Sequence, residues 1–342
     1  MKKLSTLTLG LLFAAGSAFA QSNDATVDQT GDDNDAIVEQ TNAGNNSATV
    51  SQSGDENQAD LIQRNYGAPG SAGHEADINQ EGDRNEADVL SQGGVGVNTI
   101  DLDQLGMDNY ARIDQFWGSN DAEVLQDGSE NDALISHRGT FDSEALIKQV
   151  GSDNEAFIRD AGQGTGPNTG TSSKIEQYGD DNYASIDQYG DGNSASSWVA
   201  GSDNEVLQTQ SSANNGQRVE ITGDNNTYTV DQEVGTGNRL YVNSRGTGPG
   251  GNTSDAYDSD FTATQSGSSN LISGSMGGTN NSLTITQLGD NNSVSGGLGM
   301  WDAAGFTIEG SNNVGVIDQL SNGNSAVMNI AGSGNTATIT QN

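Results

Sequence analysis

The side chains of this chain that could perform acid, base or metal chemistry are mostly carboxylates. The sequence holds 47 Asp and Glu residues, two histidines (His74 and His137) and no cysteine. A glycosidase needs carboxylates that converge on a groove, and a metal site needs ligands at set spacings. Here the carboxylates recur at regular intervals, and neither histidine has a second ligand nearby in the sequence. We therefore predict no catalytic residue, no metal site and no cofactor, and we expect the protein not to be an enzyme.

Acidic, glycine-rich segments such as Gly179–Asn182, which reads GDDN, invite comparison with calcium-binding turns. Calcium-binding β-rolls use a nine-residue repeat that contains GGxGxD. The period differs here and that motif is missing, so we interpret the Asn and Asp residues as turn formers. Loose surface binding of divalent cations remains the alternative.

The acidic segments belong to a repeat, and this repeat is what positions every other residue. Residues 177–188 read QYGDDNYASIDQ. Gln is followed two residues later by Gly, five later by Asn, seven later by Ala, nine later by an aliphatic residue and eleven later by the next Gln. The unit recurs at residues 29–40, 52–63, 104–115 and 115–126. A fixed period of this kind is the signature of a repeat architecture.

Each unit predicts one strand and one turn. Asn109, Ala111, Ile113 and Gln115 alternate with polar residues, and a period of two places them on one face of a strand. The Gly-x-x-Asn segment between strands is turn chemistry, because Gly adopts positive φ and Asn bonds its own backbone. Since the same face must point inward in every unit, consecutive units cannot form a meander of hairpins.

These constraints predict an all-β fold, a two-sided parallel β-solenoid of about 13 coils. Odd strands stack into one parallel sheet and even strands into another, and the two inward faces meet. Successive coils then lie about 4.8 Å apart along an amyloid-like axis, the ordinary spacing of strands within a sheet. Buried Asn and Gln amides would then lie above their counterparts in the next coil and form hydrogen-bonded ladders. The ladder residues that we predict are Gln29, Asn34, Gln40, Gln52, Asn57, Gln63, Gln104, Asn109, Gln115, Asn120, Gln126, Gln177, Asn182, Gln188, Asn193, Gln287, Asn335 and Gln341, and the turn glycines are Gly31, Gly54, Gly106, Gly179 and Gly190.

Some units depart from the pattern. His137, Asp160 and Ser244 stand where Gln is expected, and the apolar residues Val199, Met276, Leu298 and Ile330 take the same position elsewhere. We expect coils with these residues to rely on apolar contacts in place of amide ladders.

Residues 1–20 differ from the rest and read as a secretory signal peptide. Lys2 and Lys3 precede an apolar run, and Ala18-Phe19-Ala20 offers a cleavage site. Residues 21–342 are predicted to form a single solenoid with loop insertions near 64–75, 161–172 and 245–258. All three prolines fall in these insertions, as expected because proline breaks a strand ladder.

The unit Gln-x-Gly-x-x-Asn-x-Ala-x-φ-x-Gln, in which φ is an aliphatic residue, resembles the curlin repeat of curli subunits. The copies at Gln177 and Gln188 carry the resemblance most clearly, and it extends over nearly all of residues 23–341. The resemblance implies a bacterial protein that is exported through the periplasm and a dedicated outer-membrane pore. It also implies extracellular amyloid fibres on the cell surface that grow from a nucleator.

The repeat itself suggests how such fibres would form. Residues 336–342 read as a full strand with no cap, and the repeats begin directly at Asn23. Uncapped solenoid ends expose unpaired backbone, and head-to-tail docking of copies yields a filament. We therefore expect a secreted structural subunit of a biofilm matrix whose main partner is itself. The alternative is a non-polymerising secreted adhesin or an ice-binding protein, for which Thr284, Thr286, Thr338 and Thr340 would supply a threonine face.

Other partners are limited by charge and by the aromatic residues. The strongly acidic balance argues against nucleic-acid binding. Tyr178, Tyr189, Phe116 and Trp117 follow Gln at the start of turns. We interpret them as rings that stack between coils, with contact to surfaces or carbohydrate as the functional alternative.

Charge should also set the rate of assembly. Removal of the signal peptide changes the formal charge from −35 to −37, because two lysines leave with it. Like charges on neighbouring strands destabilise a sheet, so thioflavin kinetics should show slow assembly at low ionic strength. Assembly should be faster in salt and near the isoelectric point of about 4.1. Rates that respond to neither variable would contradict this argument.

Overall fold

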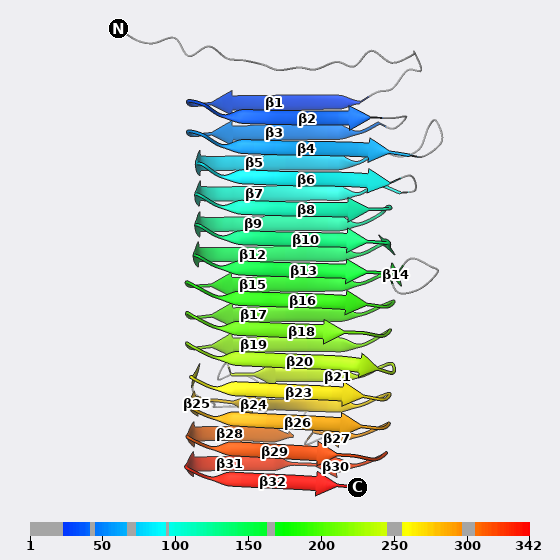
Figure 1. Ribbon diagram of the computed structural model, residues 1–342, viewed down its shortest axis with the longest axis vertical. Helices are drawn as coiled ribbons and strands as arrows, with labels where there is room; N and C mark the ends of the chain where they lie inside the picture. Colours follow the sequence, from blue (N-terminus) through cyan, green and yellow to red (C-terminus); the bar gives the residue numbers. More distant parts are fainter. Residues whose placement is uncertain are drawn as a thin grey trace.

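The computed structural model describes residues 23–41, 45–66, 73–93, 96–162, 168–244, 255–295 and 305–342. The predicted signal peptide and the three prolines lie outside these ranges. The described residues form strands, turns and no helix, and hence no helical segment with the length and apolar character needed to cross a bilayer. The strands stack along one axis from β1 to β32 (Figure 1).

One face of the solenoid is a sheet of 13 parallel strands, here called sheet B. Each strand pairs in register with the next, so that Ala111 lies against Ala133 and Ile113 against Ile135. In order along the axis, its strands are β2 (Asp35–Thr41), β4 (Gln58–Asn65), β6 (Glu86–Gly93), β8 (Tyr110–Phe116), β10 (Asp132–Arg138), β13 (Glu155–Ala161), β16 (Tyr183–Tyr189), β18 (Glu205–Gln210), β20 (Thr227–Val234), β23 (Asp260–Ser266), β26 (Ser282–Leu288), β29 (Val314–Gln319) and β32 (Thr336–Gln341).

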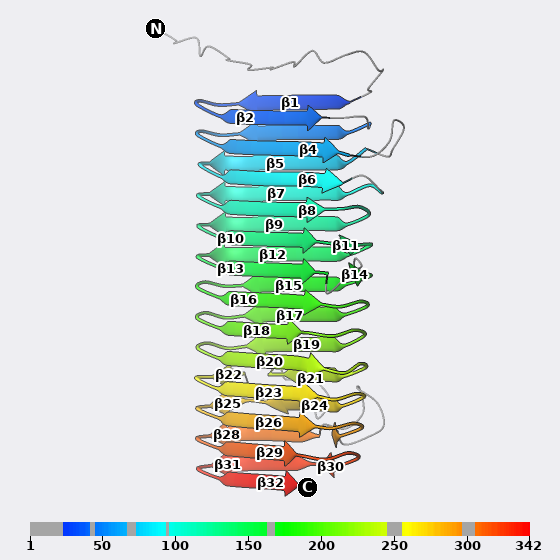
Figure 2. The same ribbon diagram turned by 45° about the vertical axis from the view of Figure 1, so that its right-hand side comes forward.

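The opposite face, sheet A, is also parallel throughout, and its strands alternate with those of sheet B along the chain (Figure 2). Its full strands are β1 (Asp24–Thr30), β3 (Ser47–Ser53), β5 (Glu75–Asp83), β7 (Thr99–Met107), β9 (Asp121–Ser129), β12 (Glu144–Ser152), β15 (Ser172–Tyr178), β17 (Ser194–Ala200), β19 (Gly216–Thr222), β21 (Arg239–Asn243) and β24 (Leu271–Met276). The remaining strands of sheet A are β22 (Ala256–Tyr257), β25 (Gly278–Thr279), β27 (Ser293–Val294), β28 (Phe306–Ser311), β30 (Ser325–Ala326) and β31 (Met328–Ser333). In a separate two-stranded sheet, β11 (Thr140–Phe141) pairs with β14 (Asn168–Thr169).

The two-sided parallel solenoid predicted from the repeat is therefore confirmed. Thirteen strands in sheet B mean 13 coils, and at the usual strand spacing the stack is roughly 60 Å long. Inward positions are buried as the period of two requires: Ala111, Ile113 and Gln115 are each fully buried on one strand. The core is a thin layer, which explains how a chain with only 31% hydrophobic residues can fold.

Sheet A contains an interruption that the spacing analysis missed. Both β27 and β28 pair with β24, so together they occupy one strand position. Residues 296–304 between them lie outside the described part of the chain. Leu298, which was expected at the glutamine position, lies outside the described residues, and Ile308 pairs with Met276 at that position. The repeat pattern was misread here because the insertion falls within a strand position, where no proline marks it.

The last third of the stack packs larger side chains than the repeat predicts. Tyr228 and Phe261 replace the inward Ala of sheet B, and their rings lie 5.6 Å apart. Phe306 of sheet A stacks on Phe261 across the core at 5.6 Å. Gly274 provides the space for it, because a Cβ there would lie 2.4 Å from the Phe306 ring. The large ring is thus offset by a glycine at the paired position of the neighbouring strand, which keeps the two sheets together.

The turns from sheet A to sheet B bring the backbones of successive coils into contact. Gly106 has a φ of +114°, and a Cβ on it would lie 1.9 Å from the carbonyl oxygen of Gly128 in the next coil. Gly31, Gly54 and Gly179 have the same arrangement, while Gly190 in the opposite turn has a φ of +104° and approaches the backbone of Ser212.

Gly106→Ala should therefore lower the free energy of unfolding of the soluble monomer. We expect a loss of at least about 1–3 kcal/mol, because alanine is strained at positive φ and would also overlap the neighbouring carbonyl. Gly216→Ala is the matched control, since φ there is not positive and a Cβ would contact nothing within 4 Å. Guanidinium unfolding of both variants tests this, and equal stability would contradict the contact described here.

Candidate assembly interface

A ladder of glutamine amides runs through the core along sheet A. The seven side chains stack directly on one another, and each Nε2 except that of the last donates to the Oε1 of the next coil at 2.6–3.1 Å. They are Gln29, Gln52, Gln80, Gln104, Gln126, Gln149 and Gln177. The second proton of each internal amide reaches a backbone carbonyl, as Gln52 does to Asp35. Each internal Oε1 is thus paired because an identical residue lies in the preceding coil.

Sheet B carries a second glutamine ladder in two runs. Gln40 donates to Gln63 at 2.9 Å, and a longer run extends from Gln188 to Gln341 with contacts of 2.7–2.9 Å. The longer run comprises Gln188, Gln210, Gln232, Gln265, Gln287, Gln319 and Gln341.

Between the two runs the column changes chemistry. Ser91, Gln115, His137 and Asp160 occupy the glutamine position there. His137 Nε2 lies 3.3 Å from Asp160 Oδ2, and both side chains are fully buried. The Oε1 atoms of Gln115 and Gln188 accept no hydrogen bond within the described ranges. A glutamine Oε1 in this column is therefore left without a donor where the residue in the preceding coil is Ser91 or Asp160 instead of glutamine.

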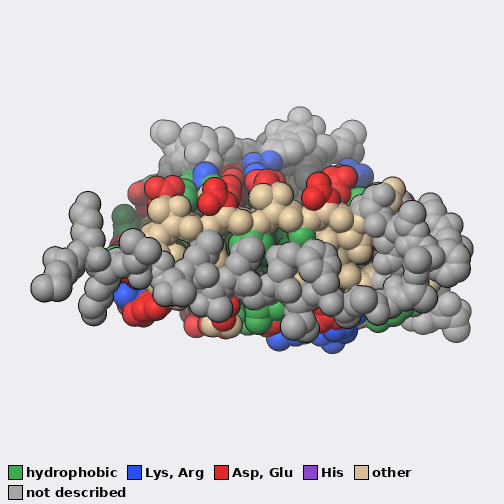
Figure 3. Space-filling model, turned by 90° about the horizontal axis from the view of Figure 1, so that it is seen from above, with side chains coloured by type: hydrophobic (Ala, Val, Ile, Leu, Met, Phe, Trp, Pro, Cys, Tyr) green, Lys and Arg blue, Asp and Glu red, His purple; other side chains and the backbone are tan. Residues whose placement is uncertain are grey.

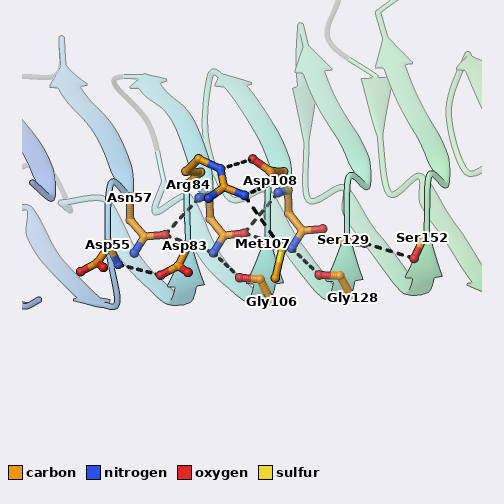
Figure 4. A network of polar contacts seen from close by, with 12 residues as sticks. Asp55, Asn57, Asp83, Arg84, Gly106, Met107, Asp108, Gly128, Ser129 and Ser152 are labelled. Atoms are coloured by element: carbon orange, nitrogen blue, oxygen red, sulfur yellow. Dashed lines mark hydrogen bonds and ion pairs between the residues drawn. The ribbon is translucent and has the colours of Figure 1, made fainter. Parts of the chain in front are cut away.

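Asparagine side chains form a third ladder in the turns that lead into sheet B (Figure 4). Both the backbone N–H and Nδ2 of Asn57 donate to Oδ1 of Asn34, at 3.0 and 3.1 Å. Nδ2 of Asn57 also donates to the carbonyl of Gly82 in the following coil. The pattern continues from coil to coil through Asn85, Asn109, Asn131, Asn154, Asn182, Asn204 and Asn226.

The ladders run in fixed and opposite directions. Every glutamine Nε2 donates toward the C-terminal coil, whereas each asparagine Oδ1 accepts from the coil that follows it. The stack is therefore polar. Its first coil presents the acceptors Gln29 Oε1 and Gln40 Oε1, and its last coil presents the donor Gln341 Nε2 and the acceptor Asn335 Oδ1.

The two end strands have open backbone edges within the described part of the chain. Val314 and Leu320 donate their N–H groups to the carbonyls of Asn335 and Gln341. Because alternate residues of a parallel strand bond to opposite neighbours, Thr336, Thr338 and Thr340 direct their N–H and C=O groups away from β29. At the other end, Ala36, Val38 and Gln40 direct theirs away from β4 by the same alternation.

The apolar side chains of these end coils are also less buried than their counterparts. Val27, Ala36, Val38, Ala337 and Ile339 are only partly buried, whereas the corresponding residues of internal coils are close to 0% exposed. Each end therefore combines open backbone, an unfinished amide ladder and exposed apolar groups on one small surface.

The sequence-predicted ladder residues lie as follows. The sheet A ladder contains Gln29, Gln52, Gln104, Gln126 and Gln177. The first run of sheet B contains Gln40 and Gln63, and the second contains Gln188, Gln287 and Gln341. Gln115 lies between the two runs and donates to the carbonyl of Thr99. Asn34, Asn57, Asn109, Asn182 and Asn335 lie in the turns before sheet B, and Asn120 and Asn193 in the turns before sheet A.

Further polar contacts link the turns and were not anticipated. Oδ1 of Asp83 accepts the backbone N–H of Asp55, and Arg84 forms a two-point ion pair with Asp108 in the next coil at 2.6–2.7 Å (Figure 4). The spacing of each acidic residue after its turn glycine is the signal that identifies these contacts in the sequence.

Carboxylates line the outer faces of the stack (Figure 3). Asp77, Asp101 and Glu123 stand in one column of sheet A. The pKa of Asp101 is raised above its ordinary 3.8, first by partial burial and then by Asp103 and Asp77. The pKa of Asp60 on sheet B is likewise raised by burial and by Asp88. Within the described ranges, no group of three or more His, Asp or Glu residues is arranged to hold a metal ion.

The aromatic residues at turn entries contact neighbouring coils. Tyr178 lies 5.9 Å from the Trp198 ring, and Trp117 lies 6.3 Å from the Phe141 ring. The guanidinium of Arg138 lies 5.6 Å from the Phe116 ring. Packing between coils accounts for these three positions.

Comparison with known proteins identifies the repeat. The family model described as the curlin associated repeat matches residues 20–41, 106–137, 118–159 and 179–211. No curated protein matches the chain. The resemblance read from the sequence is confirmed at these four regions.

Gln126→Leu should destabilise the monomer although the volume of the side chain is nearly kept. Leucine removes the donor to Gln149 Oε1 and leaves that buried acceptor unpaired, a loss of about 1–3 kcal/mol. Asp127→Ala, at an exposed position of the same strand, is the control and should change the stability by less than about 0.5 kcal/mol. Unfolding in guanidinium distinguishes the two, and an unchanged midpoint for Gln126→Leu would refute the ladder's contribution.

Acidification from neutral pH should stabilise the monomer. Because the folded-state pKa of Asp60 and Asp101 lies above the unfolded value near 3.8, the native state binds more protons between the two values. The stabilisation is complete below pH 3.8 and is lost as the pH rises through the folded-state pKa. Asp101→Asn should raise stability at pH 7 and flatten the pH profile.

Asp108→Asn is the opposite-sign control for this experiment. The pKa of Asp108 is lowered by its hydrogen bond with Arg84, so its replacement should not stabilise the monomer at pH 7. Urea unfolding between pH 4 and 7 gives both profiles. A wild-type stability that decreases as the pH is lowered from 7 to 4 would be inconsistent with the raised pKa values of Asp60 and Asp101.

Proposed function

The chain carries curlin associated repeats, and from this premise we propose that it is a secreted structural subunit that assembles head to tail into extracellular curli-type amyloid fibres of a biofilm matrix. The observation that carries the proposal is that the two ends are complementary. Gln341 Nε2 ends the sheet B ladder as a donor, and Gln40 Oε1 begins it as an acceptor. A second copy placed on the first would continue this ladder without a change of direction.

The backbone and apolar groups support the same junction. The open edge of β32 would bond with β2 of the next copy, and the partly buried Ala337 and Ile339 would cover Ala36 and Val38. The contact is heterologous and does not close, so repetition gives a filament. The side-chain Oδ1 atoms of Asn335 and Asn324 would accept the backbone N–H groups of Asn34 and Asn23 of the next copy, as Oδ1 of Asn313 accepts from Asn335 within the chain.

Sheet A makes the junction weaker than an internal contact. Its glutamine position begins with Gln29 but ends with Ile330, which pairs with Ile308. Docking would bury Gln29 Oε1 against an isoleucine, an unpaired acceptor that costs about 1–3 kcal/mol. We infer that the amides and backbone of sheet B hold the junction and that sheet A contributes mostly apolar contact and backbone hydrogen bonds.

Nothing in the arrangement of the described side chains suggests catalysis, and we propose a structural role alone. The implied partners, as proposals, are further copies of the chain, a nucleator and a dedicated export apparatus. Export through the periplasm to the cell surface follows from the resemblance and from the predicted signal peptide.

The ice-binding alternative has one supporting feature. Thr262, Thr284 and Thr338 occupy a single outer column of sheet B, and Thr264, Thr286 and Thr340 occupy the next. Val316 and Asp318 interrupt the two columns. In the earlier coils the same columns hold mostly other residues, such as Asp60, Arg112 and Phe157. We therefore favour the fibre subunit.

Thr338→Pro should stop growth at one end of the fibre. Proline removes an N–H that faces the open edge of β32 but no bond to β29, and edge strands tolerate it. The variant monomer should fold, and at substoichiometric amounts it should dock on wild-type fibres and terminate them. Thr338→Val, which keeps the N–H, is the control and should elongate normally.

Seeded thioflavin kinetics and circular dichroism measure these outcomes, and fibre diffraction should give the meridional spacing of about 4.8 Å. A proline variant that elongates at the wild-type rate would refute the head-to-tail junction. A wild-type protein that remains a monomer without this reflection would favour the adhesin or ice-binding reading.

A further inference from the structure

One part of the outer face of sheet A differs from the acidic surface around it. Strands β15, β17 and β19 place Lys174, Ser196 and Arg218 in one column. The next column holds Glu176, Trp198 and Glu220 in the same three coils. Trp198 therefore stands at the centre of a grid in which both cations lie one column away and both carboxylates lie directly beside it.

The small side chain of Ser196 leaves a notch in this grid. Serine stands between two long cationic side chains, and a depression of about 380 Å³ opens over it. Its walls are Lys174 and Arg218 on two sides and Trp198, Glu176 and Glu220 along the third. We call this depression the Trp198 notch.

The charges of the notch are balanced within it. Lys174 Nζ lies 3.2 Å from Glu176 Oε2, and Arg218 forms an ion pair with Glu220. Two cations and two carboxylates give a net charge of zero in a chain whose formal charge is −35. Each pair presents N–H donors and carboxylate acceptors side by side.

A tyrosine of the preceding coil supports the indole ring. The Tyr178 ring lies 5.9 Å from it with an interplanar angle of 42°, and Lys148 Nζ lies 5.5 Å from the Tyr178 centroid. Trp198 itself remains partly exposed at the wall of the notch. An aromatic wall that is both supported and accessible is suited to stack against a flat apolar surface.

We propose that the Trp198 notch binds a pyranose unit of an uncharged polysaccharide. A sugar ring presents C–H groups on its faces, which pack on an indole, and hydroxyl groups at its edge, which both donate and accept. The two ion pairs offer both kinds of partner within the notch. A few polar groups beside an aromatic wall are the usual make-up of a small-ligand site.

The surroundings favour a neutral ligand over the alternatives. An anionic glycan or acidic peptide would approach a chain with a formal charge of −35, and both cations of the notch are already paired with glutamate. A basic peptide would find no net negative charge in the notch itself. A sugar unit is small enough for the depression and needs no counter-charge.

The experiment uses soluble mature monomer and cellohexaose as the neutral probe, with oligogalacturonate of similar length as the anionic probe. Titration calorimetry should detect binding of the neutral probe. Trp198→Ala should weaken it at least tenfold, because the stacking surface is lost. Ser196→Gln should weaken it to a similar degree by filling the notch while the indole remains.

Trp117→Ala is the matched control, since Trp117 is an exposed tryptophan elsewhere on the stack, 55% accessible. It should leave the affinity unchanged. The proposal is overturned if neither probe binds, if only the anionic probe binds, or if Trp198→Ala and Ser196→Gln bind as the wild type does. Circular dichroism of each variant verifies the fold.

The inference does not depend on fibre formation, because the notch lies within one chain. Trp198→Ala should therefore elongate wild-type seeds at the normal rate. A wild-type protein that elongates but binds no sugar would refute the sugar-binding proposal alone. A wild-type protein that binds sugar but does not elongate would refute the fibre proposal alone.

Discussion

The structure depends on one constraint: a buried amide needs hydrogen-bonding partners, and an identical amide one coil away supplies them. Glutamine and asparagine carry donors and acceptors that an apolar core would leave unpaired, at about 1–3 kcal/mol for each group. In-register stacking pairs them along the axis, as Gln104 with Gln126 and Asn85 with Asn109. The same register fixes the backbone ladders and requires glycine where turns of adjoining coils meet. Sequence repetition is thus a physical requirement of this core.

The constraint also gives the molecule a direction. Glutamine donors point toward the last coil in both sheets, so the ends are different and complementary. Where the column changes residue, as at Asp160 before Gln188, an acceptor is left unpaired inside the chain. The ends of the stack expose amide groups that lack a partner in the same way, but there water can hydrogen-bond to them. Assembly would exchange that water for another copy of the chain.

Repulsion between carboxylates on the outer faces opposes the stabilisation by hydrogen bonds inside the stack. The register that aligns amides within the core also aligns Asp77, Asp101 and Glu123 outside it, and the pKa of Asp101 is raised by partial burial and then by the repulsion of these neighbours. Ion pairs such as Arg84 with Asp108 relieve this in a few coils. The Trp198 notch is a second place where opposite charges balance, and repetition of one notch per subunit along a fibre would present a ligand with many sites.

The sequence by itself determined the class of fold, the inward face of each strand and the chemistry of the turns. These follow from a period of two and from glycine and asparagine at fixed positions, which are local properties. It also located Gln29, Asn34 and their counterparts as residues that share a column. Only the tertiary structure decided the direction of the ladders, the interruption beyond Val294 and the aromatic core at Phe261 and Phe306. It alone brought Lys174, Trp198 and Arg218 together, because contacts between coils join residues 22 or more apart, and an eleven-residue pattern does not specify which departures from it will become neighbours.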